Sequence, residues 1–332
     1  MKKNIARILM GVVLATLCFG AFAAAAERKY AFTVSVDAPE EEVTYVYAKK
    51  FADEIVARSG GRIQVRVYPN ATLGGDRESI ESCIKGNITF VVQNTAPQVS
   101  FMPKLAIFDL PCAFDDLTGL RKAVDDPVFF GMLSKIYEDA GLKAFNYTDQ
   151  GFRLMTSNKK VEKLEDFSGI KIRTMENANH IAFWKSIGAN PTPMAFGEVY
   201  IGLQQGTIDG LENPYEGIAT SKFYEQQKYL VDTNHVPHLV SLIMSKRVYD
   251  ELSGDDQQLI AAAAQKARDE VRAEDDQVTA ARIETIKGSG TTFIHLSPAE
   301  RARIRERSKG VYDKIAAEVG SELVDAMNKA AQ

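Results

Sequence analysis

The sequence predicts an α/β fold organised in two lobes, on the strength of three observations. Short apolar or alternating runs, typical of strands, are separated by helical patterns along most of the chain. Such alternation favours strands paired mainly in parallel, with helices on the faces of the sheet. About 300 residues follow an N-terminal leader, more than one small core requires. One helical pattern, 255–287, is long enough to run across both lobes.

The first 26 residues have the layout of a secretory signal peptide. Three basic residues precede the apolar run Ile8–Phe22, and a small-residue stretch then places cleavage after Ala26. A membrane anchor is the alternative, but the run is shorter than the roughly 20 residues of a span. Removal of the leader changes the formal net charge from −4 to −7. We therefore expect an exported, acidic protein that does not bind nucleic acid.

The first half of the mature chain alternates strands with helices. An apolar face formed by Val43, Val46, Tyr47, Phe51 and Ile55 indicates the first helix, and a Ser-Gly-Gly turn ends it. The predicted strands are Tyr30–Val36, Ile63–Tyr68, Ile88–Gln93 and Ala106–Leu110, and the predicted helices are Glu40–Arg58, Arg77–Lys85 and Leu117–Ala140.

The second half repeats this pattern and ends in the long helix. Ser253 is its predicted N-cap, and the acidic residues Asp255 and Asp256 suit the positive end of the helix dipole. The predicted strands are Lys143–Thr156, Ile170–Thr174 and Leu239–Ser245, and the predicted helices are Asn177–Ile187, Glu198–Gln205 and Asp255–Lys287.

Two cysteines, Cys83 and Cys112, remain after cleavage. An oxidising compartment permits a disulfide between them, provided that their Cα atoms lie within about 7 Å. Two inert thiols are the other interpretation, and a catalytic cysteine is disfavoured because no histidine stands in a recognisable context. The sequence leaves the first two alternatives open.

The chain carries no familiar catalytic or cofactor-binding motif. Its four histidines are His180, His235, His238 and His295, and the H-x-x-H pair lacks a nearby third metal ligand. No nucleophile elbow, phosphate-binding loop or dinucleotide fingerprint is present. We therefore expect no metal and no cofactor, and a binding protein rather than an enzyme.

Two arginines and two other side chains are candidates for binding. Arg153 and Arg173 each lie between apolar neighbours in a strand-like segment, so each points to the opposite face. A guanidinium can hold a carboxylate through two parallel hydrogen bonds, whereas the alternative is a surface ion pair. Phe196 begins a helix and Asn213 lies in a loop, where side chains can face a cleft or simply pack.

The motifs, taken together, resemble those of the solute-binding proteins of tripartite ATP-independent periplasmic (TRAP) transporters, the DctP-type family. The resemblance covers essentially the whole mature chain. It rests on Pro191–Pro214, Leu73–Arg77, Phe108–Pro111, Gly151–Arg153 and Gly169–Arg173.

The resemblance implies a two-lobed periplasmic binding protein fold, each lobe a mixed sheet flanked by helices, with a long bridging helix. Lobe I would comprise 27–150 together with 239–254. Lobe II would comprise 151–238 together with about 290–325, and 255–287 would bridge the two.

The resemblance also implies a ligand site between the lobes. Arg173 matches the carboxylate-clamping arginine and Asn213 its supporting asparagine, while Arg153 and Phe196 match further pocket residues. On the opposite wall we expect Ser35, Asp37, Gln93 and Asn94 to contact the rest of the ligand. These ligand-binding residues are thus predicted to act together.

The implied ligand is a small organic anion, a carboxylate or a sulfonate such as isethionate. Sialic-acid-binding members carry Glu and Arg where this chain has Asn94 and Pro97, which argues against sialic acid. The implied partners are the two integral membrane permease subunits, and the implied location is the periplasm. The alternatives are a periplasmic sensor that presents the acid to a receptor, and a secreted enzyme that acts on a small acid.

Overall fold

The computed structural model describes residues 29–332 and contains two mixed β-sheets, each the centre of one lobe. The predicted leader lies outside the described residues. The first sheet has the strand order β2-β1-β3-β10-β4. In it β1 pairs in parallel with β2 and β3, whereas β10 is antiparallel to β3 and β4. Its strands are β1 (Tyr30–Ser35), β2 (Ile63–Tyr68), β3 (Phe90–Asn94), β4 (Leu142–Phe152) and β10 (Pro237–Ser245).

The second sheet has the strand order β11-β9-β5-β8-β6-β7. Strand β5 is antiparallel to both of its neighbours, and the other pairs are parallel. The alternation of elements predicted mainly parallel pairing. The structure is mixed because the strands that carry the chain between the lobes, β5 and β10, enter their sheets in the opposite direction. The strands are β5 (Leu154–Ser157), β6 (Lys171–Thr174), β7 (Asn190–Pro193), β8 (Gly210–Asn213), β9 (Tyr229–Val231) and β11 (Thr292–Ile294).

Helices cover both faces of the first sheet. Alternate residues of each strand face opposite sides, so Phe90 and Val92 pack against helices α2 and α10 while Val91 packs on the other side. The α-helices are α2 (Val43–Arg58), α3 (Asp76–Ile84), α4 (Leu117–Asp125), α5 (Pro127–Asp139), α6 (Ala178–Ser186), α7 (Val199–Gln204), α8 (Tyr215–Thr220), α9 (Lys246–Asp250), α10 (Gly254–Gly288), α11 (Pro298–Val319) and α12 (Ser321–Ala330). The 3-10 helices are η1 (Ala96–Ser100), η2 (Pro103–Asp109), η3 (Leu164–Phe167), η4 (Phe196–Glu198) and η5 (Phe223–Gln226).

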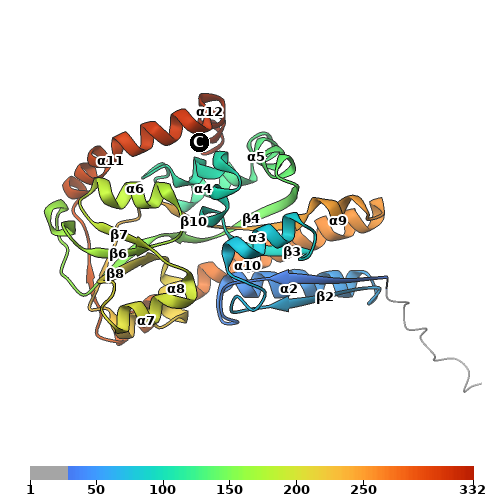
Figure 1. The fold of residues 1–332 in the computed structure, drawn as a ribbon, viewed down its shortest axis with the longest axis horizontal. Coiled ribbons are helices and arrows are strands. Elements are labelled where there is room, and N and C mark those ends of the chain that lie inside the picture. The colour runs from blue at the N-terminus through green and yellow to red at the C-terminus, as the bar shows by residue number, and fades with distance from the viewer. Residues whose placement is uncertain (1–28) are drawn as a thin grey trace, which may run out of the picture.

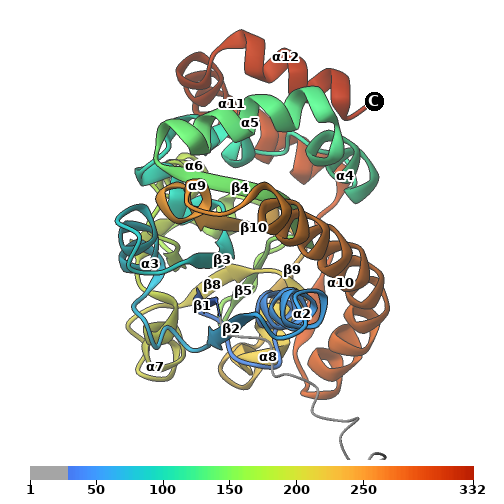
Figure 2. The same cartoon turned by 90° about the vertical axis from the view of Figure 1, so that its right-hand side faces the viewer.

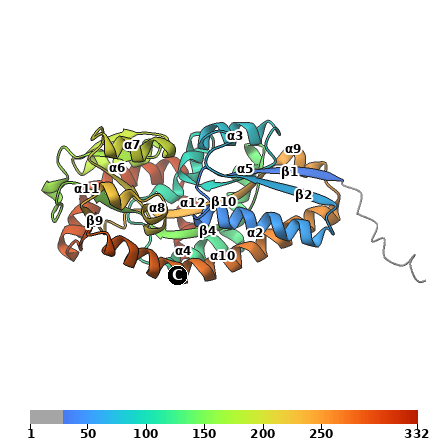
Figure 3. The ribbon, with the colours of Figure 1, turned by 90° about the horizontal axis from the view of Figure 1, so that it is seen from below.

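The two sheets lie side by side, with β6, β7 and β8 in one half of the molecule and β2 and β3 in the other (Figure 1). The predicted long helix is confirmed as α10, and the Ser253 hydroxyl accepts from the Asp256 N–H at its start. Figure 3 shows α10 running beneath both halves. Its Ile260 belongs to a core of the first lobe and its Ile286 to a core of the second lobe, so one rigid helix spans the two lobes.

The C-terminal helices pack over one end of the molecule. Figure 2 shows α11 and α12 above α4 and α5. Helix α11 contributes Ile304 to a core of the second lobe and Ile315 to a core of the first. It therefore joins the two lobes at a second place.

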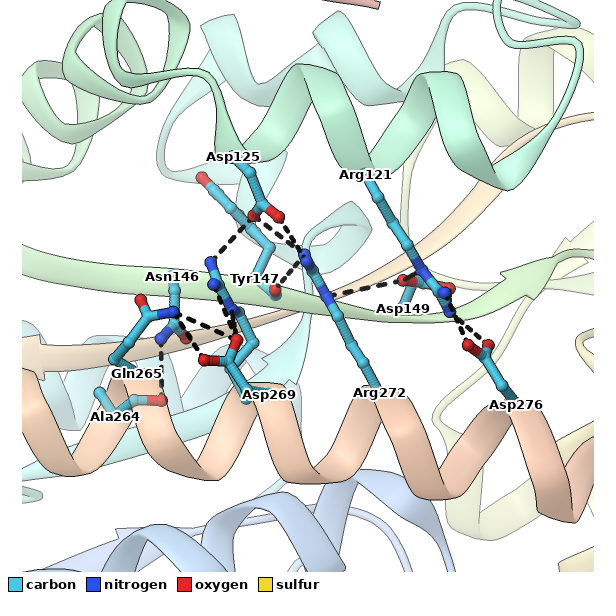
Figure 4. A network of polar contacts seen from close by, with 11 residues as sticks. Arg121, Asp125, Asn146, Tyr147, Asp149, Ala264, Gln265, Asp269, Arg272 and Asp276 are labelled. Carbon is cyan, nitrogen blue, oxygen red and sulfur yellow. Dashed lines mark hydrogen bonds and ion pairs between the residues drawn. The ribbon is translucent and has the colours of Figure 1, made fainter.

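Polar contacts fasten the middle of α10 to the first lobe (Figure 4). Arg272 donates to Asp125 of α4 at 2.5 Å and to the Tyr147 carbonyl of β4 at 2.7 Å. Arg121 of α4 joins Asp149 of β4 to Asp276 of α10, with contacts of 2.8 and 2.6 Å. Several charges share this network, which fixes the helix more firmly than an isolated surface pair would.

One predicted strand is wrong. Residues 106–110 lie in and just after the 3-10 helix η2, whose residues Leu105 to Phe108 are buried in a core of the first lobe. Periodicity cannot separate a short buried strand from a short buried helix, and Pro103 at the start favours the helix. The predicted helix 117–140 is likewise divided, because Asp126 caps a new helix that begins at Pro127.

Both cysteines are free thiols, which rules out the disulfide alternative in this structure. Cys83 is buried on α3, where its thiol lies 3.7 Å from the Thr89 carbonyl oxygen, and Cys112 follows η2. Within residues 29–332, no helix is both long enough and apolar enough to cross a membrane.

Candidate functional site

The chain passes between the two sheets at two adjacent places, which set the base of the site. Strand β4 leads through Arg153 into β5, and β9 leads back through 232–236 into β10. The two connections are tied together, since the Arg153 N–H donates to the Val236 carbonyl at 2.9 Å. Arg153 therefore lies at the junction of the lobes.

Two adjoining cavities lie between the lobes. The outer cavity has a volume of about 930 Å³ and the inner chamber about 30 Å³. Both are lined by Asp37, Asp76, Arg173, Met175 and Phe196. The inner chamber is completed by Glu42, Thr44, Asn94, Arg153, Asn213 and His238.

Six of the eight predicted ligand-binding residues line the inner chamber: Asp37, Asn94, Arg153, Arg173, Phe196 and Asn213. Ser35 and Gln93 line neither cavity. The Ser35 hydroxyl is bonded to the Ser79 hydroxyl at 2.9 Å. Gln93 precedes Asn94 in β3, so its side chain points to the opposite face of the sheet.

Arg173 is the most available cation of the site. It lies on β6, 3% exposed, where Nε and Nη2 donate to the Met194 carbonyl at 3.0 and 2.6 Å. Within residues 29–332, Nη1 has no hydrogen-bond partner. The guanidinium lies 6.0 Å from the centre of the Phe196 ring. Burial lowers its pKa to about 10, against the opposing charge of Glu212, so it is charged at neutral pH.

Arg153 is already neutralised by the protein. Its Nε and Nη2 donate to the carboxylate of Glu212, and Nη1 bonds to Nδ1 of His238. Although burial acts to raise the pKa of Glu212, the charge of Arg153 and a hydrogen bond from His235 hold it below its usual range. Burial and the Arg153 charge lower the pKa of His238 well below its usual value. The sequence could not show this pairing, because Glu212 lies 59 residues beyond Arg153.

Asn213 occupies a tight position at the end of β8. A Cβ at Gly217, in the following helix, would lie 2.4 Å from Nδ2 of Asn213. Glycine is therefore needed there so that the amide can sit against α8 and line the chamber. Asn94 is more constrained, since its Oδ1 accepts from the Ala96 N–H and its Nδ2 donates to the Leu239 carbonyl.

Sequence reasoning missed a group of carboxyls on the first-lobe wall. Glu42 precedes α2 and Asp76 begins α3, and both line the inner chamber beside Asp37. Burial first, and then the charge of Asp37, raise the pKa of Glu42 to about 8 and that of Asp76 well above its usual value. Burial also raises the pKa of Asp37, against the effect of Arg173. Asp76 lies in the Leu73–Arg77 motif, and this motif is the one sequence feature that could have pointed to it as a site residue.

Three residues on the rim of the outer cavity adopt the left-handed backbone conformation. Asn70 and Ala71 have φ of 55° and 53°, and Lys222, across the cleft, has φ of 53°. This conformation is uncommon for residues other than glycine and asparagine, and such strain concentrates at ligand clamps and moving segments. Both rims of the cleft thus carry the strain that is typical of a binding site.

Among the described residues, no group of three or more His, Cys, Asp or Glu side chains is placed to hold a metal ion. His235 and His238 instead lie against the Arg153–Glu212 pair. The arrangement is that of an interlobe site with one available guanidinium, an amide and several carboxyl groups.

Known proteins are similar to this chain in sequence and in fold. A family model described as bacterial extracellular solute-binding protein, family 7, matches residues 34–319. The C4-dicarboxylate-binding periplasmic protein of Rhodobacter capsulatus is 31% identical over 308 residues, which span 91% of this chain and 90% of that protein.

Two solved structures match over nearly their whole length. The sugar acid binding protein of Advenella mimigardefordensis, in complex with galactonate, has a TM-score of 0.87 and 32% identity, covering 92% of this chain and 98% of that one. A TRAP periplasmic solute-binding protein from a Polaromonas species, bound to D-erythronate, has a TM-score of 0.85 and 36% identity, covering 90% and 98%.

Proposed function

Because the chain belongs to family 7 of the bacterial extracellular solute-binding proteins, we propose that it is the periplasmic solute-binding component of a TRAP transporter. It captures a small organic anion between its two lobes and delivers it to the membrane permease subunits. The names of the relatives support this role: a C4-dicarboxylate-binding periplasmic protein, a sugar acid binding protein in complex with galactonate, and a TRAP periplasmic solute-binding protein bound to D-erythronate. The leader that the sequence predicts at residues 1–26 supports export.

The observation that carries the proposal is the position of Arg173. This buried guanidinium lines both cavities and keeps one nitrogen without a partner among residues 29–332, whereas the charge of Arg153 is balanced by Glu212. A carboxylate or sulfonate placed at Arg173 would gain charge-assisted hydrogen bonds in a site of low dielectric. Asn213 adds an amide on the same side, and Phe196 supplies an apolar contact.

The ligand would also stabilise the closed arrangement of the lobes. Arg173 and Asn213 belong to the second sheet, and Asp37 and Asn94 belong to or follow strands of the first. A ligand that contacts both sets binds the closed state better than the open one, so it shifts the population towards closure. Closure then distinguishes loaded from empty protein at the permease.

A thermal-shift screen of small acids against matched neutral compounds tests the proposal. We expect an acid such as D-erythronate to raise Tm and erythritol, which lacks the carboxylate, to leave it unchanged. A ligand at one hundred times its Kd stabilises the native state by about 2.7 kcal/mol. The proposal is refuted if no small organic acid in a broad screen raises Tm. Chemical conversion of the bound acid, followed by NMR, would favour the secreted enzyme instead.

A further inference from the structure

We propose that Asp109, which lines neither cavity, is a positioning residue that fixes the strand carrying Arg173 against the wall of the first lobe. The inference rests on the proposed function, since it concerns the residue that holds the anion. It adds a determinant of affinity that lies outside the cleft.

Asp109 accepts three hydrogen bonds from the second lobe. It ends η2, whose preceding residues pack in a core of the first lobe, and it is 3% exposed. Its Oδ2 accepts from the side-chain amides of Asn177 and Asn179 at 2.8 and 2.9 Å, and its Oδ1 lies 3.1 Å from Nε2 of His180. A carboxylate can only accept, so Nε2 carries the proton and donates it. All three donors come from the cap and first turn of α6.

Asn177 connects this contact to Arg173. It caps α6, because its Oδ1 accepts from the N–H groups of Asn179 and His180. Its own N–H donates to the Met175 carbonyl at 2.8 Å, and Met175 lines both cavities. Arg173 lies only four residues before the cap, on β6. A shift of the cap therefore moves this short segment, and the guanidinium moves with it.

The same amide also joins the second lobe to the opposite wall of the inner chamber. Nδ2 of Asn177 donates to the Ala96 carbonyl at 2.8 Å. The Ala96 N–H in turn donates to Oδ1 of Asn94, which lines the chamber. The two hydrogens of the Asn177 amide thus serve Ala96 and Asp109, and together these bonds set the place of the α6 cap relative to Asn94.

Replacement of Asp109 by Asn keeps the shape of the side chain and removes its charge and one acceptor. The new amide turns an NH₂ group towards the donors of α6, so at least one buried donor loses its partner. The cap of α6 then loses its fixed place against the first lobe, and so does Arg173.

Calorimetry on the mature chain, residues 27–332, measures the effect. The probe is the acid of the thermal-shift screen that raises the Tm of the wild type most, with D-erythronate tried first. We expect D109N to bind this acid at least tenfold more weakly than the wild type. The control D139N changes an exposed aspartate of α5 that pairs with Lys135, and it should bind as the wild type does. An unchanged Kd in folded D109N would overturn the inference.

A double-mutant cycle with Arg173 separates positioning from a general loss of stability. R173K keeps the charge but not the planar fork, so it should weaken binding at least tenfold in the wild-type chain. If Asp109 acts through Arg173, the same substitution should weaken binding less than threefold in the D109N background. Independent distant sites have additive effects, so an equal penalty for R173K in both backgrounds would overturn the inference.

The exchange variant D109N/N177D tests the contact itself. N177D keeps a residue that caps helices well, but it sets two carboxylates against each other. In D109N/N177D the amide and the carboxylate exchange places, so the acid should bind at least fivefold more tightly than it does to N177D. Absence of this recovery would overturn the inference.

A milder variant decides the inference if D109N does not fold. N179A removes one of the three donors and leaves the cap in place, so it should weaken binding at least threefold, and an unchanged Kd would overturn the inference. All these contrary results leave the proposed function standing. Failure of every acid in the broad screen instead refutes the proposed function, and the inference with it.

Discussion

Replacement of Glu42 by Gln should make the protein lose less stability as the pH rises. Burial, and then the charge of Asp37, raise the pKa of Glu42 from 4.5 to about 8, against hydrogen bonds from Gln150 and Thr44. The folded protein therefore binds this proton more tightly than the unfolded chain does. Its contribution to stability is fully present below pH 4.5 and is lost as the pH rises towards 8.

The two pKa values set the size of the effect. Between pH 6 and pH 8 the contribution of Glu42 to the free energy of unfolding falls by about 2 kcal/mol. Between low pH and pH 8 the loss reaches about 4 kcal/mol, an upper limit because Asp37 and Glu216 influence the same proton. The Gln side chain imitates the protonated acid, since its oxygen can accept from Gln150 and Thr44.

Urea unfolding at pH 5, 6, 7 and 8 measures this difference. E42Q should lose about 2 kcal/mol less than the wild type between pH 6 and pH 8, and the two proteins should differ by less than about 1 kcal/mol at pH 5. The control E40Q, at an exposed neighbouring position, should follow the wild type. Equal pH dependence of E42Q and the wild type would refute the reasoning.

Two further substitutions probe the base of the site and its amide. E212Q leaves the buried charge of Arg153 unpaired, so it should lower the free energy of unfolding by roughly 3–5 kcal/mol in urea unfolding. A loss below about 1 kcal/mol would contradict the pairing of Arg153 with Glu212. G217A should weaken acid binding at least tenfold in calorimetry, because the new Cβ would lie 2.4 Å from Nδ2 of Asn213. The control G131A, whose new Cβ would lie in open space, should bind the acid as the wild type does. Equal affinity of G217A and G131A would show that Asn213 is not needed for binding.

The sequence predicted the elements whose patterns are long or clearly bounded. The helix Gly254–Gly288 followed from its length and its Ser253 cap, and most strands followed from alternation. The buried run 106–110 was misread, because its apolar residues satisfy a strand and a 3-10 helix equally well. The local sequence pattern thus identifies an element where a cap or a clear period is present. It does not identify the element where the only feature is a run of buried apolar residues.

The residues of the site could be predicted from the sequence where they lie in a recognisable motif. They could not be predicted where the fold brings together residues that are far apart in the sequence. Arg173 and Asn213 were identified by resemblance and line the chamber. Glu42 and Asp76 were missed because carboxylates at helix starts are ordinary on surfaces, and only the fold buries these two beside Asp37. The pairing of Arg153 with Glu212 likewise depends on the β5–β8 register, which brings Leu154 opposite Asn213.

The most direct measurement of the central claim is the affinity of R173A for the acid that stabilises the wild type most. Loss of a buried charge-assisted pair costs about 2–5 kcal/mol, so calorimetry should show a Kd higher by roughly 30-fold to several thousand-fold. Circular dichroism should show the native fold. R58A, which removes an exposed arginine paired with Glu54, should bind as the wild type does. An unchanged Kd in folded R173A would contradict the assignment of Arg173 as the residue that holds the anion.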